Sequence, residues 1–192
     1  KPGRDILTLL NLIHKDEELS RSMRVLEGHK WIKPFAVVFA HSGDSWFWLA
    51  GLILVVIFGE KTWKIWALIL SGSILALAVF VLSLKFMIRR RRPEGEWGQI
   101  YRITDPHSFP SGHAARAFSL AILAMGLGPI WLAWLLVFWA PLVGLARVIL
   151  GVHYLSDVIV GFLIGIIYGL IVLLLRPVYL PYIIGILNIF QG

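Results

Sequence analysis

The sequence predicts an all-α membrane protein, a polytopic bundle of about six transmembrane helices preceded by an interfacial helix. Two observations carry this prediction. Of the 192 residues, 58% are hydrophobic and only 15% are charged. The apolar residues also form runs such as 65–84, long enough to cross the hydrocarbon core of a bilayer. A soluble domain of this size exposes too much surface to hide so many apolar side chains, so that class is excluded.

The first 30 residues predict a helix that lies on the membrane surface. Apolar residues such as Ile6, Leu9 and Ile13 recur at helical spacing among many charged residues. An amphipathic helix of this kind binds in the headgroup region instead of crossing the bilayer. We therefore assign residues 1–30 to an interfacial helix of a single domain, 1–192.

Residues 31–176 predict a six-span catalytic core. The expected spans are 31–41, 46–58, 65–84, the two halves of 117–146 on either side of Gly126 and Pro129, and 158–175. The first two are short and joined at residues 42–45. Residues 177–192 are an apolar C-terminal segment interrupted by Pro181, expected to lie at the interface or to add a half-span.

A glycine stripe marks the last predicted span. Gly161, Gly165 and Gly169 follow one another at four-residue spacing, which places them on one helix face. Such a face lets two helices approach closely. Packing inside the bundle is the favoured interpretation and a dimer seam is the alternative, so the chain is expected to be a monomer or a homodimer.

One substantial polar loop, residues 86–110, interrupts the apolar chain. Six alternating spans place this loop and residues 147–157 on one membrane face, and both termini on the other. Ten Lys and Arg residues then fall on the terminal side and eight on the loop side. The positive-inside rule favours cytoplasmic termini, so we expect a multi-pass protein of the cell (inner) membrane with its site on the extracytoplasmic face.

The formal net charge of +7 indicates an anionic partner. In a mostly apolar chain this favours lipid headgroups or phosphate over nucleic acid. The chain has no Cys, so neither a disulfide framework nor a thiolate metal site is available.

The first polar cluster follows the span 65–84. Lys85 and Arg92 stand seven residues apart, about two helical turns, so they are expected to point the same way. Pro93 disfavours helix at Arg92. Taken alone, the run of arginines is equally typical of a basic cluster that contacts lipid headgroups.

The second cluster is Phe109 to His113. Ser111 is predicted to cap the following helix, which leaves the N–H groups of Gly112 and His113 at a positive helix end suited to phosphate. The alternative is an ordinary helix start with an interfacial histidine.

The third cluster is Arg147 to Asp157. His153 and Asp157 stand four residues apart, so on one helix face the carboxylate accepts the Nδ1 proton and leaves Nε2 as a nucleophile. Arg147 adds a donor suited to bidentate phosphate contact. A helix-capping pair and a metal site are the alternatives for His153 and Asp157.

Together the three clusters resemble the phosphatidic acid phosphatase type 2 superfamily, membrane lipid phosphatases that share a histidine-phosphatase core with bacterial acid phosphatases and vanadium haloperoxidases. Its pattern is KxxxxxxRP, then PSGH, then SRxxxxxHxxxD. The matching residues are Lys85, Arg92 and Pro93, then Pro110, Ser111, Gly112 and His113, then Arg147, His153 and Asp157. One departure is Ala146, where the pattern has Ser, which removes a hydroxyl near the phosphate.

The resemblance implies a catalytic mechanism. His153 attacks phosphorus to form a phosphohistidine, Asp157 orients His153, and His113 protonates the leaving oxygen and then activates water. The implied phosphate-binding groups are Lys85, Arg92, Ser111, Gly112 and Arg147. No metal ion or other cofactor is implied.

The expected substrate is a lipid phosphate that enters sideways from the bilayer. Undecaprenyl pyrophosphate and phosphatidylglycerophosphate are the main candidates, ahead of lipid A phosphate and phosphatidic acid. Arg89, Arg90 and Arg91 favour a diphosphate. A phosphotransferase with the same histidine pair and a lipid-phosphate transporter are the alternative functions, although the chain lacks the inverted repeat typical of transporters.

Four further polar residues lie near the same predicted face. His41 and Asp44 are expected to form a capped turn, with substrate contact as the alternative. Asp105 and His107 are placed at the entrance by their position alone.

Overall fold

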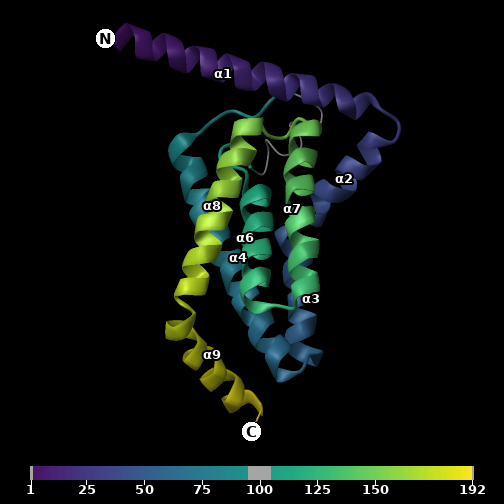
Figure 1. The fold of residues 1–192 in the computed structure, drawn as a ribbon, viewed down its shortest axis with the longest axis vertical. Coiled ribbons are helices and arrows are strands. Elements are labelled where there is room, and N and C mark those ends of the chain that lie inside the picture. Colours follow the sequence, from purple (N-terminus) through teal and green to yellow (C-terminus); the bar gives the residue numbers. More distant parts are fainter. Residues whose placement is uncertain (1, 95–104, 192) are drawn as a thin grey trace.

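The computed structural model describes residues 2–94 and 105–191, and most of these residues lie in helices (Figure 1). The helices are α1 (Pro2–Arg24), the 3-10 helix η1 (Val25–Gly28), α2 (Ile32–Ser42), α3 (Ser45–Phe58), α4 (Lys61–Ile88), α6 (Gly112–Leu127), α7 (Ile130–Ile149), α8 (Leu155–Leu174) and α9 (Arg176–Gln191). The all-α class is therefore confirmed.

Three helices, α4, α7 and α8, are each long and apolar enough to cross a membrane. Helices α2 and α3 meet that criterion only as a pair bent by 54°, and α6 is a shorter apolar helix of 16 residues. The expected count of six spans is not confirmed. The physical reason is length: 11 and 14 residues rise only about 16 and 21 Å, less than the roughly 30 Å of a bilayer core.

The two ends of the chain lie at opposite ends of the bundle (Figure 1). Helix α1 crosses the end where α6 and α8 begin, and α9 extends from the other end. This arrangement does not fit the expectation that both termini lie opposite the polar loop. The expectation takes residues 31–58 as two crossings, whereas α2 and α3 meet the length criterion only as one bent pair.

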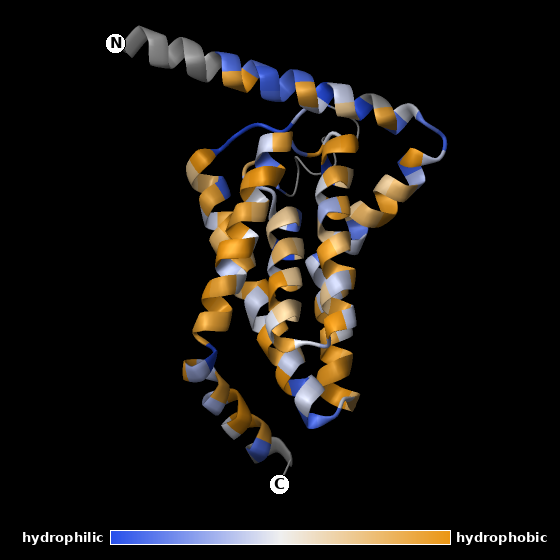
Figure 2. Cartoon of the chain, viewed as in Figure 1, coloured by the Kyte–Doolittle hydropathy of each residue, from blue (hydrophilic) through white to orange (hydrophobic). Residues whose placement is uncertain are grey.

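The outward faces of the bundle are apolar along most of its length. Figure 2 shows hydrophobic residues over α3, α4, α7 and α8, while hydrophilic ones gather in α1 and at the connections. Large side chains such as Phe47, Phe80 and Phe138 are exposed on these faces. In water such surfaces would aggregate, so they suit a surrounding lipid phase.

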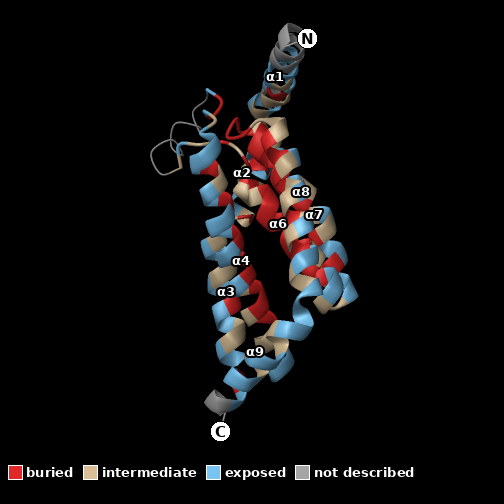
Figure 3. Ribbon diagram, turned by 90° about the vertical axis from the view of Figure 1, so that its left-hand side faces the viewer, coloured by how far each residue is buried: buried red, intermediate tan, exposed pale blue. Residues whose placement is uncertain are grey.

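Helix α6 packs at the centre of the bundle, and its buried face consists mainly of alanine and leucine (Figure 3). The glycine stripe of α8 faces it: a Cβ at Gly161 would come within 2.6 Å of the Ser111 carbonyl oxygen, and one at Gly165 would overlap the Ala115 carbonyl. The interpretation of the stripe as packing inside the bundle is confirmed. Close contact of α6 with α8 brings Ser111 and Asp157 together, because the Ser111 N–H donates to the Asp157 carbonyl at 3.0 Å.

We predict that Gly165→Ala lowers the free energy of unfolding by about 1–3 kcal/mol, because the new methyl group meets backbone that cannot rotate away. Thermal unfolding in detergent measures the effect. The matched control is Gly51→Ala in α3, whose Cβ would have no atom within 4 Å among the described residues. Equal stability of the two variants would contradict close packing of α6 on α8.

Candidate active site

Three segments meet at the end of the bundle that α1 covers. Helices α4 and α7 end there, while α6 and α8 begin there (Figure 1). Backbone contacts join the segments: Arg91 and His107 form an isolated bridge, and the Ser108 N–H donates to the Arg90 carbonyl at 2.9 Å. The three sequence clusters thus come together in space.

Lys85 and Arg92 converge, but not on one helix face. Helix α4 ends at Ile88, and Arg89 adopts a left-handed conformation with φ of 53° that turns the chain. Helical spacing, on which the expectation that they point the same way was based, therefore does not extend to Arg92. The two cations meet because Lys85 Nζ (2.5 Å) and Arg92 Nη2 (2.8 Å) both donate to Asp105 Oδ2. Both are buried.

The start of α6 agrees with the sequence prediction. Ser111 is the N-cap residue, and its Oγ accepts the Ala114 N–H at 3.4 Å. Gly112 and His113 both line a cavity next to this helix end. Helix N-termini favour anions because their N–H groups lack intrahelical partners.

His153 lies just before α8, which begins at Leu155, so His153 and Asp157 do not share a helix face as predicted. They are nevertheless neighbours, with His153 Nδ1 3.5 Å from Asp157 Oδ2. On the other side of the ring, Nε2 lies 3.3 Å from Arg92 Nη1. A guanidinium only donates hydrogen bonds, so Nε2 presents its lone pair and the ring proton belongs on Nδ1.

The His153 ring is held in its neutral form. Burial of the ring, together with the charges of Arg92, Arg147 and Lys85, keeps the pKa of His153 well below its usual value. Its exposure is 1%. A neutral imidazole with an unprotonated Nε2 is a competent nucleophile near pH 7.

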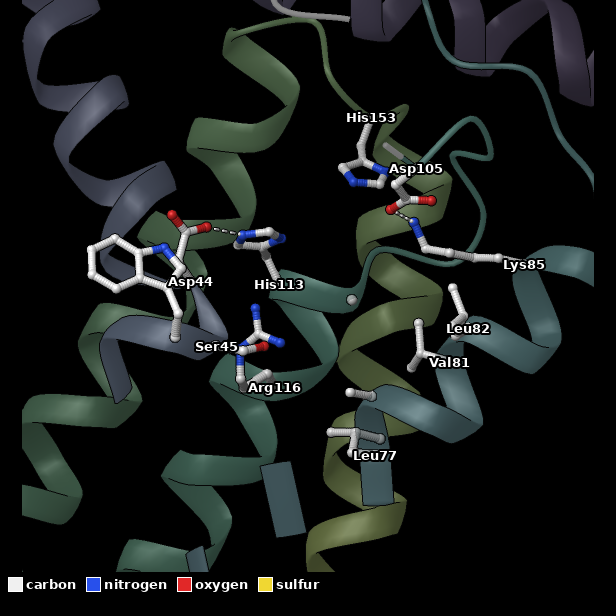
Figure 4. A pocket seen from close by; sticks show the side chains of 13 residues that line it. Asp44, Ser45, Leu77, Val81, Leu82, Lys85, Asp105, His113, Arg116 and His153 are labelled. Carbon is white, nitrogen blue, oxygen red and sulfur yellow. Dashed lines mark hydrogen bonds and ion pairs between the residues drawn. The ribbon is translucent and has the colours of Figure 1, made fainter. Parts of the chain in front are cut away.

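His113 pairs with a carboxylate that sequence reasoning had assigned to a capped turn. His113 Nε2 lies 2.6 Å from Asp44 Oδ1 (Figure 4). The other oxygen, Asp44 Oδ2, lies 3.1 Å from His41 Nδ1. Asp44 precedes α3 at the bend of the broken span, 69 residues from His113. The one available signal was a His and an Asp in a polar break between apolar segments.

Arg116 is a second residue whose place the sequence did not predict. Its Nε and Nη2 donate to the Gly43 carbonyl at 2.9 and 2.5 Å, which ties α6 to the end of α2. Its side chain is buried and lines the same cavity.

The remaining predicted residues have distinct positions. Arg147 is buried at 1% exposure, and its carbonyl accepts the His153 N–H at 3.2 Å. Asp105 lines the cavity as expected for an entrance residue. His107 contributes its carbonyl, which accepts Lys85 Nζ at 2.9 Å, while its ring packs edge-on against Phe86.

The cavity has a volume of about 360 Å³ and two kinds of wall (Figure 4). The lining residues are Asp44, Ser45, Trp46, Leu77, Ala78, Val81, Leu82, Lys85, Asp105, Gly112, His113, Arg116 and His153. The polar wall carries both histidines, and the apolar wall belongs to α4 and Trp46. Trp46 and Leu82 are also exposed on the outside of the bundle, so the apolar wall opens sideways.

This arrangement combines an anion-binding set of cations, a histidine with an available lone pair, and a second histidine paired with a carboxylate. Within residues 2–94 and 105–191, no three His, Asp or Glu side chains gather as potential metal ligands. The chemistry that these groups support is attack on an anionic, electrophilic centre such as a phosphate ester.

Comparison with known proteins also indicates phosphatase chemistry. Decaprenylphosphoryl-5-phosphoribose phosphatase of Mycobacterium tuberculosis is 36% identical over 129 residues, which cover 65% of this chain and 69% of that protein. An undecaprenyl-diphosphatase of Sulfolobus acidocaldarius is 32% identical over 127 residues, 64% of this chain and 60% of that one.

Two solved structures share the fold. LpxE of Aquifex aeolicus superposes with a TM-score of 0.63 and 32% identity, covering 81% of this chain and 93% of that one. A transmembrane PAP2-type phosphatidylglycerolphosphate phosphatase of Bacillus subtilis gives a TM-score of 0.69 and 26% identity, covering 84% of each chain. The expectation of a phosphoric ester hydrolase is confirmed by these relatives. Since the family model of the PAP2 superfamily matches residues 65–179, the chain belongs to the PAP2 superfamily.

Proposed function

We propose that this protein is an integral membrane phosphatase that hydrolyses a lipid phosphate or isoprenyl pyrophosphate through a phosphohistidine on His153. The observation that carries the proposal is the position of His153, which lines the same cavity as Lys85 and Arg116 and whose Nε2 lies 3.3 Å from the buried Arg92 Nη1. A phosphate bound to these cations places phosphorus in front of the lone pair.

In the first step, His153 Nε2 attacks phosphorus and the bond to the leaving oxygen breaks. Asp157 lies beside Nδ1 and stabilises the positive charge that develops on the ring. Lys85, Arg92 and Arg147 balance the charge on the phosphoryl oxygens, with Ser111 and the backbone of Gly112 at the helix end. The bound phosphate replaces the Asp105 carboxylate as the partner of Lys85 and Arg92.

His113 is the general acid and base. With Nε2 paired to Asp44, its Nδ1 is left to give a proton to the leaving oxygen and later to take one from the attacking water. Asp44 is the positioning residue in this pair, because it fixes the ring and stabilises its protonated form. Water attack then releases inorganic phosphate and restores His153.

A polyprenyl chain is the substrate tail that fits best. The apolar wall of the cavity opens between α3 and α4 on the lipid-facing side, which suits a tail that remains in the bilayer while its phosphate enters. Two relatives are named for polyprenyl phosphate substrates. A phosphatidylglycerophosphate is the second candidate, supported by the structural relative from Bacillus subtilis.

The membrane side of the site follows from the distribution of basic residues. At the site end of the bundle stand Arg4, Lys15, Arg21, Arg24, Lys30, Lys33, Lys85, Arg89, Arg90, Arg91, Arg92, Arg116 and Arg147, and at the other end stand Lys61, Lys64 and Arg176. The positive-inside rule applied to this distribution favours a cytoplasmic site, the reverse of the expectation from six spans. The preference holds even without the four cations buried at the site.

The central prediction concerns the nucleophile. With undecaprenyl pyrophosphate or phosphatidylglycerophosphate in detergent and EDTA, the wild-type protein releases phosphate, and His153→Ala lowers the rate by about 10³-fold or more. A colorimetric phosphate assay measures both. A strict requirement for Mg²⁺ would refute metal-independent histidine catalysis, and release that depends on an added acceptor would favour the phosphotransferase.

Asp44→Asn is expected to lower kcat by about 10- to 100-fold with little change in KM, because the neutral amide no longer stabilises protonated His113. Steady-state kinetics with the preferred substrate measure kcat and KM separately. Glu60→Gln is the matched control, since Glu60 also precedes a helix as its N-cap residue, at the far end of the bundle. An unchanged kcat in folded Asp44→Asn would remove Asp44 from the mechanism.

Sideways entry predicts a difference between substrates. Trp46→Ala should raise KM for a polyprenyl phosphate by about 10-fold, equivalent to roughly 1.4 kcal/mol of lost contact, and leave KM for a short water-soluble phosphate ester unchanged. Phe58→Ala, an exposed aromatic at the other end of α3, is the control. Equal effects on both substrates would argue against tail binding at Trp46.

Orientation is testable because the chain has no Cys. Two single-cysteine variants, Ser22→Cys in α1 and Thr62→Cys at the start of α4, report on which side of the membrane each end of the bundle lies. In intact cells a membrane-impermeant thiol reagent is expected to label Thr62→Cys and spare Ser22→Cys. The opposite labelling would place the site on the extracytoplasmic face.

A further inference from the structure

Helix α1 supplies the N-terminal caps of α8. The N-cap residue of α8 is Tyr154, an aromatic residue rather than one of the short polar residues preferred at that position. The first N–H groups of a helix need partners from outside it. Ser20 Oγ accepts the Leu155 N–H at 2.9 Å, and Asp16 Oδ1 accepts the Ser156 N–H at 3.0 Å.

The same aspartate is connected to the catalytic carboxylate through an arginine. Asp16 Oδ2 accepts Arg90 Nη2 at 2.8 Å and the Ser156 hydroxyl at 2.5 Å. Arg90 Nη1 donates to Asp157 Oδ1 at 2.8 Å, and its guanidinium lies 4.0 Å above the Tyr154 ring. Hydrogen bonds to Asp16 and Asp157 and stacking on the Tyr154 ring therefore fix the position of the Arg90 guanidinium.

Asp157 divides its two oxygens between different partners. Oδ1 accepts a hydrogen bond from Arg90 Nη1. Oδ2 accepts the Tyr154 N–H at 2.9 Å and lies beside His153 Nδ1. The carboxylate is fully buried. The Arg90 contact on Oδ1 and the Tyr154 N–H on Oδ2 together fix which oxygen faces His153.

A second part of α1 contacts the loop that carries His153. Gly151 has φ of 64°, and a Cβ there would come within 2.5 Å of Arg24 Nε. One residue earlier, Met23 packs against the cluster of the buried Ala114, Val148 and Val158. These contacts place α1 against the catalytic loop at its C-terminal end as well as at Asp16.

We propose that α1 is a positioning element of the active site, in which Asp16 acts through Arg90 to hold Asp157 with Oδ2 facing His153. The inference rests on the proposed phosphohistidine mechanism. Asp16 and Arg90 touch no substrate. Their effect on catalysis passes through the orientation of Asp157, so docking of the N-terminal helix determines the rate of the chemical step.

The charges explain why Asp16 matters. Arg90 lies between two carboxylates, Asp16 and Asp157, and is only 23% exposed. With the Asp16 charge removed, the guanidinium is attracted to Asp157 alone. The carboxylate then moves toward Arg90 and away from His153 Nδ1.

The test is Asp16→Asn, which keeps the size of the side chain and changes its charge. We expect kcat to fall by about 10- to 100-fold, the range for a displaced catalytic group, while KM stays within about twofold. Asp16→Glu should recover part of the rate. Glu18→Gln, which removes a neighbouring carboxylate on the exposed side of α1, should leave kcat unchanged.

A double-mutant cycle identifies the route. If Asp16 acts through Arg90, the variant with both Asp16→Asn and Arg90→Gln is no slower than Arg90→Gln alone. Tryptophan fluorescence melting in detergent confirms that each variant is folded. Effects that multiply, or an unchanged kcat in folded Asp16→Asn, would overturn the inference. Absence of phosphate release by the wild-type protein would instead refute the proposed function itself.

Discussion

The structure depends on the burial of several cationic side chains at one end of an apolar bundle. Lys85, Arg92, Arg116 and Arg147 are each at most 7% exposed. Removing such charges from water is unfavourable unless nearby groups compensate them. Asp105 accepts hydrogen bonds from Lys85 and Arg92, and the Gly43 carbonyl accepts one from Arg116. In the proposed function, a phosphate group takes the place of the Asp105 carboxylate as the acceptor for Lys85 and Arg92.

Helix direction supplies the rest of the site. Because α4 and α7 end where α6 and α8 begin, the ends of these four helices meet at one end of the bundle. The small residues of α6 and the glycine stripe of α8 allow these two helices to approach closely, so Ser111 and Asp157 are joined through the backbone. The bent α2–α3 span adds Asp44 from a third direction, and α1 closes the end of the bundle.

Local patterns predicted the parts of the structure that local physics determines. The long apolar runs, the break near Pro129 and the cap at Ser111 all appear where expected. Lys85 and Arg92 do converge, but not through helical spacing, because α4 ends at Ile88 and Arg89 adopts a left-handed conformation without being a glycine. His153 likewise precedes α8, so its contact with Asp157 comes from the loop rather than from helical spacing.

The contacts that sequence reasoning missed are long-range. Asp44 meets His113 across 69 residues and Asp16 meets Ser156 across 140. No periodicity links such positions, because each depends on how a bent span and a surface helix pack against the finished bundle. The expected number of six crossings is not confirmed for a related reason: two short apolar segments have the same composition whether they cross twice or form one bent crossing.

The most direct test of this account is to trap the phosphoenzyme. After brief mixing with a substrate labelled in its terminal phosphate, in EDTA, the protein is denatured at alkaline pH, at which phosphohistidine survives, and the labelled peptide is sequenced by mass spectrometry. The account predicts a phosphoryl group on His153 and none on the His153→Ala variant. Label on a different residue, or full activity with no phosphoenzyme formed, would contradict it.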